Sequence, residues 1–217
     1  MPEVNVKSPN AITRGVSSLR FVDEISGLSA IYEESVNVVT LRLTPSSALL
    51  ADAERAVDVL HAERFEVRPG APSTAVSSLR SFPHLAADVL LWSEVLADLT
   101  GCEAVGVRLA RLTEPMCPRF HVDRVVLRLV MTYHGPGTEF VGSEDVDRRH
   151  LGLPDVDGSH GRLVRTTACI RRAQTFDLVA LKGEGSPDNE YGGAVHRSPG
   201  DTGGAARLAM TLDPLAD

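Results

Sequence analysis

The stretch from Arg119 to Val141, RFHVDRVVLRLVMTYHGPGTEFV, constrains the fold of this chain more than any other. It places His121 and Asp123 at the head of an apolar, β-branched run, and side chains two apart on a strand point to the same face. A strand here predicts that an imidazole and a carboxylate face one point. His196, in the downstream segment GGAVHRSP, would complete a 2-His-1-carboxylate set, which is typical of non-haem iron(II) sites with open coordination positions.

The second half of the chain is a series of short apolar segments separated by glycine and proline turns. Many short strands with such turns indicate a sandwich or a barrel. Residues 142–162 are polar and acidic, with several glycines, and are expected to form a long loop. The expected strands cover residues 104–112, 120–133, 164–170, 176–183, 194–198 and 207–213, with a further short strand after the turn at 134–138.

The last expected strand has two distinct faces. Arg207, Ala209 and Thr211 alternate with the larger apolar residues Leu208, Met210 and Leu212. The apolar set is expected to pack in the core, so the face with Arg207 and Thr211 should border a cavity. Two interpretations of Arg207 remain open at this point: a partner for a bound carboxylate, or a structural arginine paired with a nearby acid.

The first half of the chain has helical spacing. Residues 49–65 follow a helix-entry sequence, residues 84–99 carry the strongest helical pattern, and Gly101 suits a C-terminal cap. The segment 36–43 alternates like a strand, whereas residues 18–27 fit a short helix or an ordered arm. We expect the helices at 50–64 and 84–99 to cover the outer face of the C-terminal sheet, because a lone sheet leaves an apolar face wet.

Composition limits the classes of function. A chain of 217 residues with 43% hydrophobic residues fits one domain, here a helix-rich part (1–101) and a metal-binding core (102–217). A net charge of −7 provides no global attraction to nucleic acid or anionic membrane. No apolar run approaches the roughly 20 residues of a membrane span, and residues 1–15 lack a secretory pattern. Three cysteines without paired spacing favour a reducing cytoplasm.

The order His-x-Asp, distal His, then Arg resembles the iron(II)- and 2-oxoglutarate-dependent oxygenases, and in particular their prolyl-hydroxylase branch. The resemblance covers roughly residues 117–213. Its matching positions after the His-x-Asp pair are Arg128, Thr132, Tyr133, the turn Gly135-Pro136-Gly137-Thr138-Glu139-Phe140, His196, Pro199, Gly203, Gly204 and Arg207. It implies an α+β fold with a double-stranded β-helix core, that is, a cupin-like jelly-roll, with the N-terminal helices packed on it.

The same resemblance implies roles for individual residues. His121, Asp123 and His196 would hold iron(II), and Arg207 would grip the distal carboxylate of 2-oxoglutarate with two hydrogen bonds. Tyr133 would donate to that carboxylate. The protein would then be a dioxygenase that uses O2 and 2-oxoglutarate to oxidise a small molecule.

Other carboxylate partners remain open. Arg128 and Arg197 are rivals of Arg207, and Ala209 stands where many family members have Ser or Thr. Cys117, four residues before His121, provides an alternative zinc ligand.

The chain also resembles, more closely, an uncharacterised bacterial family known as domain of unknown function 1826. The matching segments are Cys117-Pro118-Arg119-Phe120-His121-Val122-Asp123, the Gly-Pro-Gly-Thr-Glu turn, Lys182-Gly183-Glu184 and Val195-His196-Arg197-Ser198-Pro199. This resemblance implies no activity. Two alternatives to the 2-oxoglutarate enzyme therefore stay open: an iron oxygenase whose substrate itself chelates the metal, and a non-catalytic zinc-binding or metal-homeostasis protein.

Overall fold

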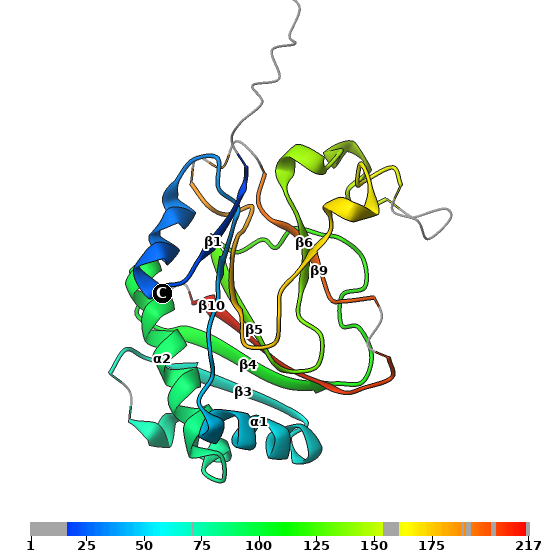
Figure 1. Cartoon of the computed structure of the whole chain (residues 1–217). Coiled ribbons are helices and arrows are strands. Elements are labelled where there is room, and N and C mark those ends of the chain that lie inside the picture. Colours follow the sequence, from blue (N-terminus) through cyan, green and yellow to red (C-terminus); the bar gives the residue numbers. More distant parts are fainter. Residues whose placement is uncertain are drawn as a thin grey trace, which may run out of the picture.

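The main sheet of the computed structural model has seven strands, drawn from both halves of the chain (Figure 1). The structure describes residues 17–70, 72–153, 161–187, 189, 192–200 and 203–215. Residues 1–15, considered above for a secretory signal, and residues 154–160 of the expected loop lie outside the described residues. The strand order is β1 (Leu19–Val22), β2 (Val38–Leu41), β8 (Leu178–Lys182), β5 (Leu127–His134), β10 (Arg207–Pro214), β4 (Val105–Leu112) and β3 (Ala62–Val67).

A second, smaller sheet lies against one part of the main sheet. It has the order β7 (Arg171–Arg172), β6 (Glu139–Val141) and β9 (Val195–Arg197), and its strands pair antiparallel. In the main sheet β1 and β2 pair in parallel, whereas all the other pairs are antiparallel. Val130 of β5 and Phe140 of β6 belong to one buried cluster, so side chains from both sheets fill the space between them.

Two α-helices cover the other face of the main sheet, as expected from the sequence (Figure 1). They are α1 (Ser47–Val59) and α2 (Pro83–Thr100). The Ser46 hydroxyl caps α1 by accepting a hydrogen bond from the Leu49 N–H at 3.1 Å, and α2 ends at Gly101 with a φ of +70°. Leu85, Val89, Trp92 and Leu96 of α2 share a core with Leu129 and Met131 of β5.

Short 3-10 segments connect these elements. They are η1 (Ile25–Tyr32), η2 (Ser73–Leu79), η3 (Ser143–Asp145), η4 (Arg148–His150) and η5 (Thr167–Cys169). Within the part of the chain that the structure describes, no helix combines the length and the apolar character that crossing a bilayer requires.

Three sequence-based assignments differ from the structure. The helix expected over 49–65 ends at Val59, and residues 62–67 form β3 instead, because Phe65 and Val67 turn inward while Arg64 and Glu66 stay exposed along β4. Residues 18–27 contain a strand, β1, before η1 begins. The strand expected over 164–170 does not form: Val164 makes only an isolated bridge with Val146, residues 167–169 form η5, and the strand that pairs with β6 is β7, just after the expected range.

The strand expected over 120–133 is shorter than predicted. Only Leu127–His134 forms β5, and His121 makes an isolated bridge with His196. The intervening backbone bonds to a glycine turn in place of a sheet neighbour: the Asp123, Val125 and Val126 carbonyls accept hydrogen bonds from the N–H groups of residues 184, 185 and 183. His121 and Asp123 therefore lie in an irregular segment at the sheet edge.

Candidate metal centre

His121, Asp123 and His196 come together at the junction of the two sheets. One ligand atom from each residue lies within 4.8 Å of the others. The Asp123 carboxylate lies 3.5 Å from His121 Nε2 through Oδ1 and 3.1 Å from His196 Nε2 through Oδ2. The expectation that these three residues converge across more than 70 positions of sequence is confirmed by this geometry.

Backbone pairing fixes the two histidines relative to each other. His121 and His196 exchange both of their backbone N–H···O=C hydrogen bonds, each at 3.0 Å, so their side chains project from directly opposed positions. The imidazole ring centroids are 4.4 Å apart. This backbone bridge is present in place of the regular strand that the sequence predicted for His121. It brings His196 next to His121 and Asp123.

The hydrogen bonds of the rings favour metal ligation. His121 Nδ1 lies 3.0 Å from the Arg119 carbonyl oxygen, and His196 Nδ1 lies 3.0 Å from the Ala194 carbonyl oxygen. A carbonyl only accepts, so in the neutral ring Nδ1 carries the proton and Nε2 keeps a free lone pair. Both Nε2 atoms face the Asp123 carboxylate. Donor lone pairs that face one another in this way repel unless a cation or a proton lies between them.

Asp123 remains ionised in this environment. Burial alone would raise its pKa, but the close approach of His121 and His196 and the charge of Arg128 hold the pKa far below its usual range. The proximity of Asp123 likewise raises the pKa of His121. Asp123 Oδ2 is buried and makes no hydrogen bond of good geometry among the described residues. A buried carboxylate oxygen in this state fits a metal ligand, as does the nitrogen and oxygen donor set.

Arg128 contacts the metal cluster through the Asp123 carboxylate. Its Nη1 lies 2.8 Å from Asp123 Oδ2, while its Nε and Nη2 donate to the two Asp213 oxygens at 2.6 and 2.7 Å. The guanidinium is therefore held by two carboxylates of the protein itself. This placement does not leave Arg128 free to grip the carboxylate of a cosubstrate.

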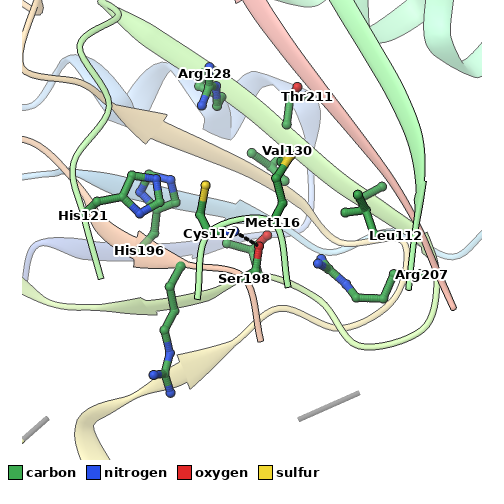
Figure 2. Close-up of a pocket in the computed structure, with 13 residues that line it drawn as sticks. Leu112, Met116, Cys117, His121, Arg128, Val130, His196, Ser198, Arg207 and Thr211 are labelled. Atoms are coloured by element: carbon green, nitrogen blue, oxygen red, sulfur yellow. Dashed lines mark hydrogen bonds between the residues drawn. The ribbon is translucent and has the colours of Figure 1, made fainter. Parts of the chain in front are cut away.

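The pocket beside the histidines contains most of the other predicted residues (Figure 2). Arg207 and Thr211 both line it, while Leu208, Met210 and Leu212 belong to the helix-side core. The predicted division of the two faces of β10 is thus confirmed. Figure 2 shows the two histidines on one side of the pocket and Arg207 on the other, with its guanidinium directed toward the middle.

Arg207 is 2% exposed, and its hydrogen bonds go to neutral groups. Its Nε donates to the Pro136 carbonyl at 2.7 Å, and its Nη2 donates to the Thr132 hydroxyl at 3.2 Å. Among the described residues no acidic side chain forms a salt bridge with it. Burial and the nearby charge of Arg172 lower its pKa to about 10. The alternative of a structural arginine paired with an acid is not what the structure contains.

Tyr133 lies on the opposite face of the sheet from the pocket. Its hydroxyl donates to Asp88 Oδ2 at 2.7 Å, and its ring belongs to the helix-side core. Alternation along β5 explains this position, since Val130 faces the pocket and Tyr133 is three residues further on. The structure does not bring Tyr133 to the metal cluster.

Cys117 and Arg197 line the pocket without joining the metal cluster. The group of close-set ligand atoms found within the described residues holds His121, Asp123 and His196, and Cys117 is not a member. Arg197 donates from Nε to Glu139 Oε2 at 2.7 Å and stacks on the Phe120 ring at 4.4 Å. A zinc site that includes the Cys117 thiol finds no support in this arrangement.

Sequence reasoning missed two residues that shape the site. Asp213 anchors Arg128, and it continues the alternation of residues 207, 209 and 211 on β10, so this pattern was a usable signal. Glu139, at the end of the Gly-Pro-Gly-Thr-Glu turn, was assigned no role from the sequence. It is 4% exposed and accepts hydrogen bonds from Arg172 and Arg197. No local pattern predicts this pairing, because it joins three separate segments.

The turn Gly183-Glu184-Gly185 holds the Asp123 segment in place, which gives a prediction. A Cβ at Gly183 would lie 1.8 Å from the Val125 carbonyl oxygen, so Gly183→Ala must displace one of the two backbones. We expect a loss of about 1–3 kcal/mol in the free energy of unfolding and a clear weakening of metal binding. Urea unfolding and metal titration measure the two effects. Gly200→Ala is the control, because its nearest neighbour would be 3.9 Å away; equal effects of both variants would contradict this role of the turn.

Comparisons with known proteins agree with this architecture. A family model described as Protein of unknown function (DUF1826) matches residues 22–213. No curated protein matches the sequence.

Solved structures share the fold at low sequence identity. The rice dioxygenase for auxin oxidation has 13% identity and a TM-score of 0.50, over 91% of this chain and 83% of that one. A putative oxygenase from Shewanella oneidensis has 13% identity and a TM-score of 0.50, over 90% and 89%. At this identity the likeness establishes a mixed α/β fold of the kind seen in oxygenases, and nothing about substrate.

Proposed function

The chain belongs to the DUF1826 family, and we propose that this member is a non-haem iron(II) oxygenase that uses 2-oxoglutarate and O2 to oxidise a small molecule. His121, Asp123 and His196 would hold the iron. The observation that carries the proposal is the convergence of two imidazole Nε2 atoms and one ionised carboxylate beside a pocket that contains an arginine without an acidic partner among the described residues.

The donor set supports iron(II) over a structural zinc site. Two histidines and one carboxylate form the set associated with iron(II) oxygenases, whereas structural zinc sites are closed by four ligands that usually include thiolates. Asp123 supplies the negative charge, and the carbonyls at Arg119 and Ala194 orient the two rings. Arg128, in the wall of the pocket, keeps the carboxylate in position through an ion pair.

Arg207 supports the use of 2-oxoglutarate. A buried cation is costly without an anion, and the Pro136 carbonyl and the Thr132 hydroxyl orient the guanidinium without neutralising it. A carboxylate bound in the pocket would neutralise it through charge-assisted hydrogen bonds. Bound iron, with 2-oxoglutarate and O2, supplies the oxidising chemistry, and the protein side chains position the cosubstrate and the target C–H bond.

The two-sheet core supports a finer description of the fold. We interpret the facing sheets, with the metal cluster at their junction, as a jelly-roll core. The helices α1 and α2 would then stabilise this core by covering the outer face of its larger sheet. The fold shared with a dioxygenase and a putative oxygenase agrees with this interpretation.

Metal analysis combined with oxygen uptake tests the proposal. The purified protein loaded anaerobically with iron(II) should consume O2 only when 2-oxoglutarate is present, and should form succinate. Uptake that depends on an added substrate but not on 2-oxoglutarate would favour an oxygenase whose substrate chelates the metal. Tight zinc binding without any uptake would favour a metal-homeostasis protein.

A further inference from the structure

A second pocket lies on the other side of the main sheet from the metal cluster. Val130 lines the pocket beside His196, whereas the next residue, Met131, lines the second pocket, and adjacent residues of a strand point to opposite faces. The second pocket is bordered by α2, by the start of η1 and by the segment that leads into α1. It is therefore separate from the site described above.

One carboxylate lies in the wall of this pocket. Asp88 of α2 accepts hydrogen bonds through Oδ2 from the Trp92 indole N–H at 3.0 Å and from the Tyr133 hydroxyl at 2.7 Å. Both donors are neutral, and no basic side chain in the described part of the chain forms a salt bridge with Asp88. Burial raises the pKa of Asp88, while its two hydrogen bonds oppose the rise.

Apart from Thr44 and Ser46, the other described residues that line the pocket are apolar or aromatic. Trp92, Met131 and Phe176 form its base, and each belongs to the helix-side core. The rim includes Ile25 and Leu91, which are 46% and 42% exposed and are thus large apolar side chains open to solvent. Mainly apolar walls with a few polar groups are typical of small-molecule sites, where the polar groups orient the ligand.

Phe176 gives independent support for a functional pocket. It adopts a φ of +72° and is the one non-glycine residue with positive φ among the described residues. This conformation is costly for an aromatic side chain, and such outliers cluster at ligand sites. The Phe176 ring lies edge-on to the Tyr133 ring, with centroids 5.8 Å apart. Phe176 lines the same pocket as Asp88.

We propose that this second pocket binds a small organic cation, namely a primary ammonium group on an apolar or aromatic body. The ammonium group would pair with the Asp88 carboxylate, which is the only acidic group among the described residues that line the pocket, and the apolar body would cover Trp92, Met131 and Phe176. The ligand ammonium group would supply the positive charge that the half-buried Asp88 carboxylate lacks, and the aromatic rings of the pocket would also attract a cation. The assignment does not depend on the function of the metal cluster.

Trp92 provides a direct readout, because it is the single tryptophan of the chain and it donates to Asp88. Phenethylamine titrated into the native protein should change the tryptophan emission with saturation, and calorimetry should give the same affinity. The neutral isostere 2-phenylethanol should bind at least about tenfold more weakly, since it lacks the charge that strengthens the hydrogen bond.

Asp88→Asn preserves the shape of the side chain and its ability to accept from Trp92 and Tyr133, and it should weaken phenethylamine binding about tenfold or more. Asp98→Asn, an exposed change on the same helix, should leave binding unchanged. The proposal would be overturned by no saturable binding of the amine, by equal affinity for the amine and the alcohol, or by equal affinity in Asp88→Asn. The comparison of amine and alcohol uses native protein, so it decides the question even if Asp88→Asn does not fold.

Discussion

Asp123→Ala should weaken iron(II) binding by more than about 100-fold while leaving the fold intact, because loss of outer-sphere partners alone typically costs 10- to 100-fold and this change removes a ligand. Asp123 is the single anionic member of the cluster. The segment that carries it is held by its backbone, through the Glu184 N–H and the Asp123 carbonyl, so the fold does not depend on the side chain. Arg128 keeps its paired hydrogen bonds to Asp213 and is not left as an unpaired cation.

Anaerobic calorimetry with iron(II) measures this effect, with circular dichroism as a check on folding. Asp98→Ala is the matched control, because Asp98 is an exposed aspartate on α2. It should bind iron(II) like the native protein. Native-like affinity in Asp123→Ala would remove this residue from the metal centre.

Arg207→Met should reduce the affinity for 2-oxoglutarate, measured anaerobically with iron(II) present, by at least about tenfold, since each hydrogen bond to a charged group contributes about 1.5–3 kcal/mol. Iron affinity should not change, because Arg207 donates its hydrogen bonds to Pro136 and Thr132 and not to the metal cluster. Thermal stability without ligand should stay constant or rise, because an apolar side chain of similar length replaces a buried cation that has no acidic partner.

Arg197→Met is the informative comparison for Arg207. Arg197 also lines the pocket, but its Nε is bonded to Glu139. Loss of the Arg197 guanidinium should lower the stability of the fold, since the buried Glu139 carboxylate loses a partner. It should reduce the affinity for 2-oxoglutarate less than Arg207→Met does. A larger loss of 2-oxoglutarate affinity in Arg197→Met would transfer the carboxylate-binding role to Arg197. No binding of 2-oxoglutarate to the native protein would favour the oxygenase whose substrate chelates the metal.

Alternation along strands carried most of the correct predictions. The faces of β10 were predicted because Arg207, Ala209 and Thr211 alternate with large apolar residues, and a central strand must divide them between its two sides. The same rule, applied from Arg128 along β5, would have excluded Tyr133 from the pocket, where family resemblance had placed it. For Tyr133, the alternation along β5 is thus more informative than the matching residue type and spacing in the oxygenase family.

Contacts between distant segments explain the elements that local sequence patterns failed to predict. Residues 62–67 follow a helix and contain good helix formers, yet they pair with β4 because a strand there buries Phe65 and Val67. The segment with Asp123 leaves the expected strand because its carbonyls bond to the turn at 183–185, which lies some 60 residues away. Such pairings between distant segments have no local signature in one sequence.

A structure of the native protein after anaerobic loading with iron(II) tests the central claim most directly. We predict a single metal ion bound by His121 Nε2, His196 Nε2 and a carboxylate oxygen of Asp123, with the remaining positions open toward the pocket that Arg207 lines. An ion bound elsewhere, or an ion coordinated by the Cys117 thiol as a fourth protein ligand, would contradict the account.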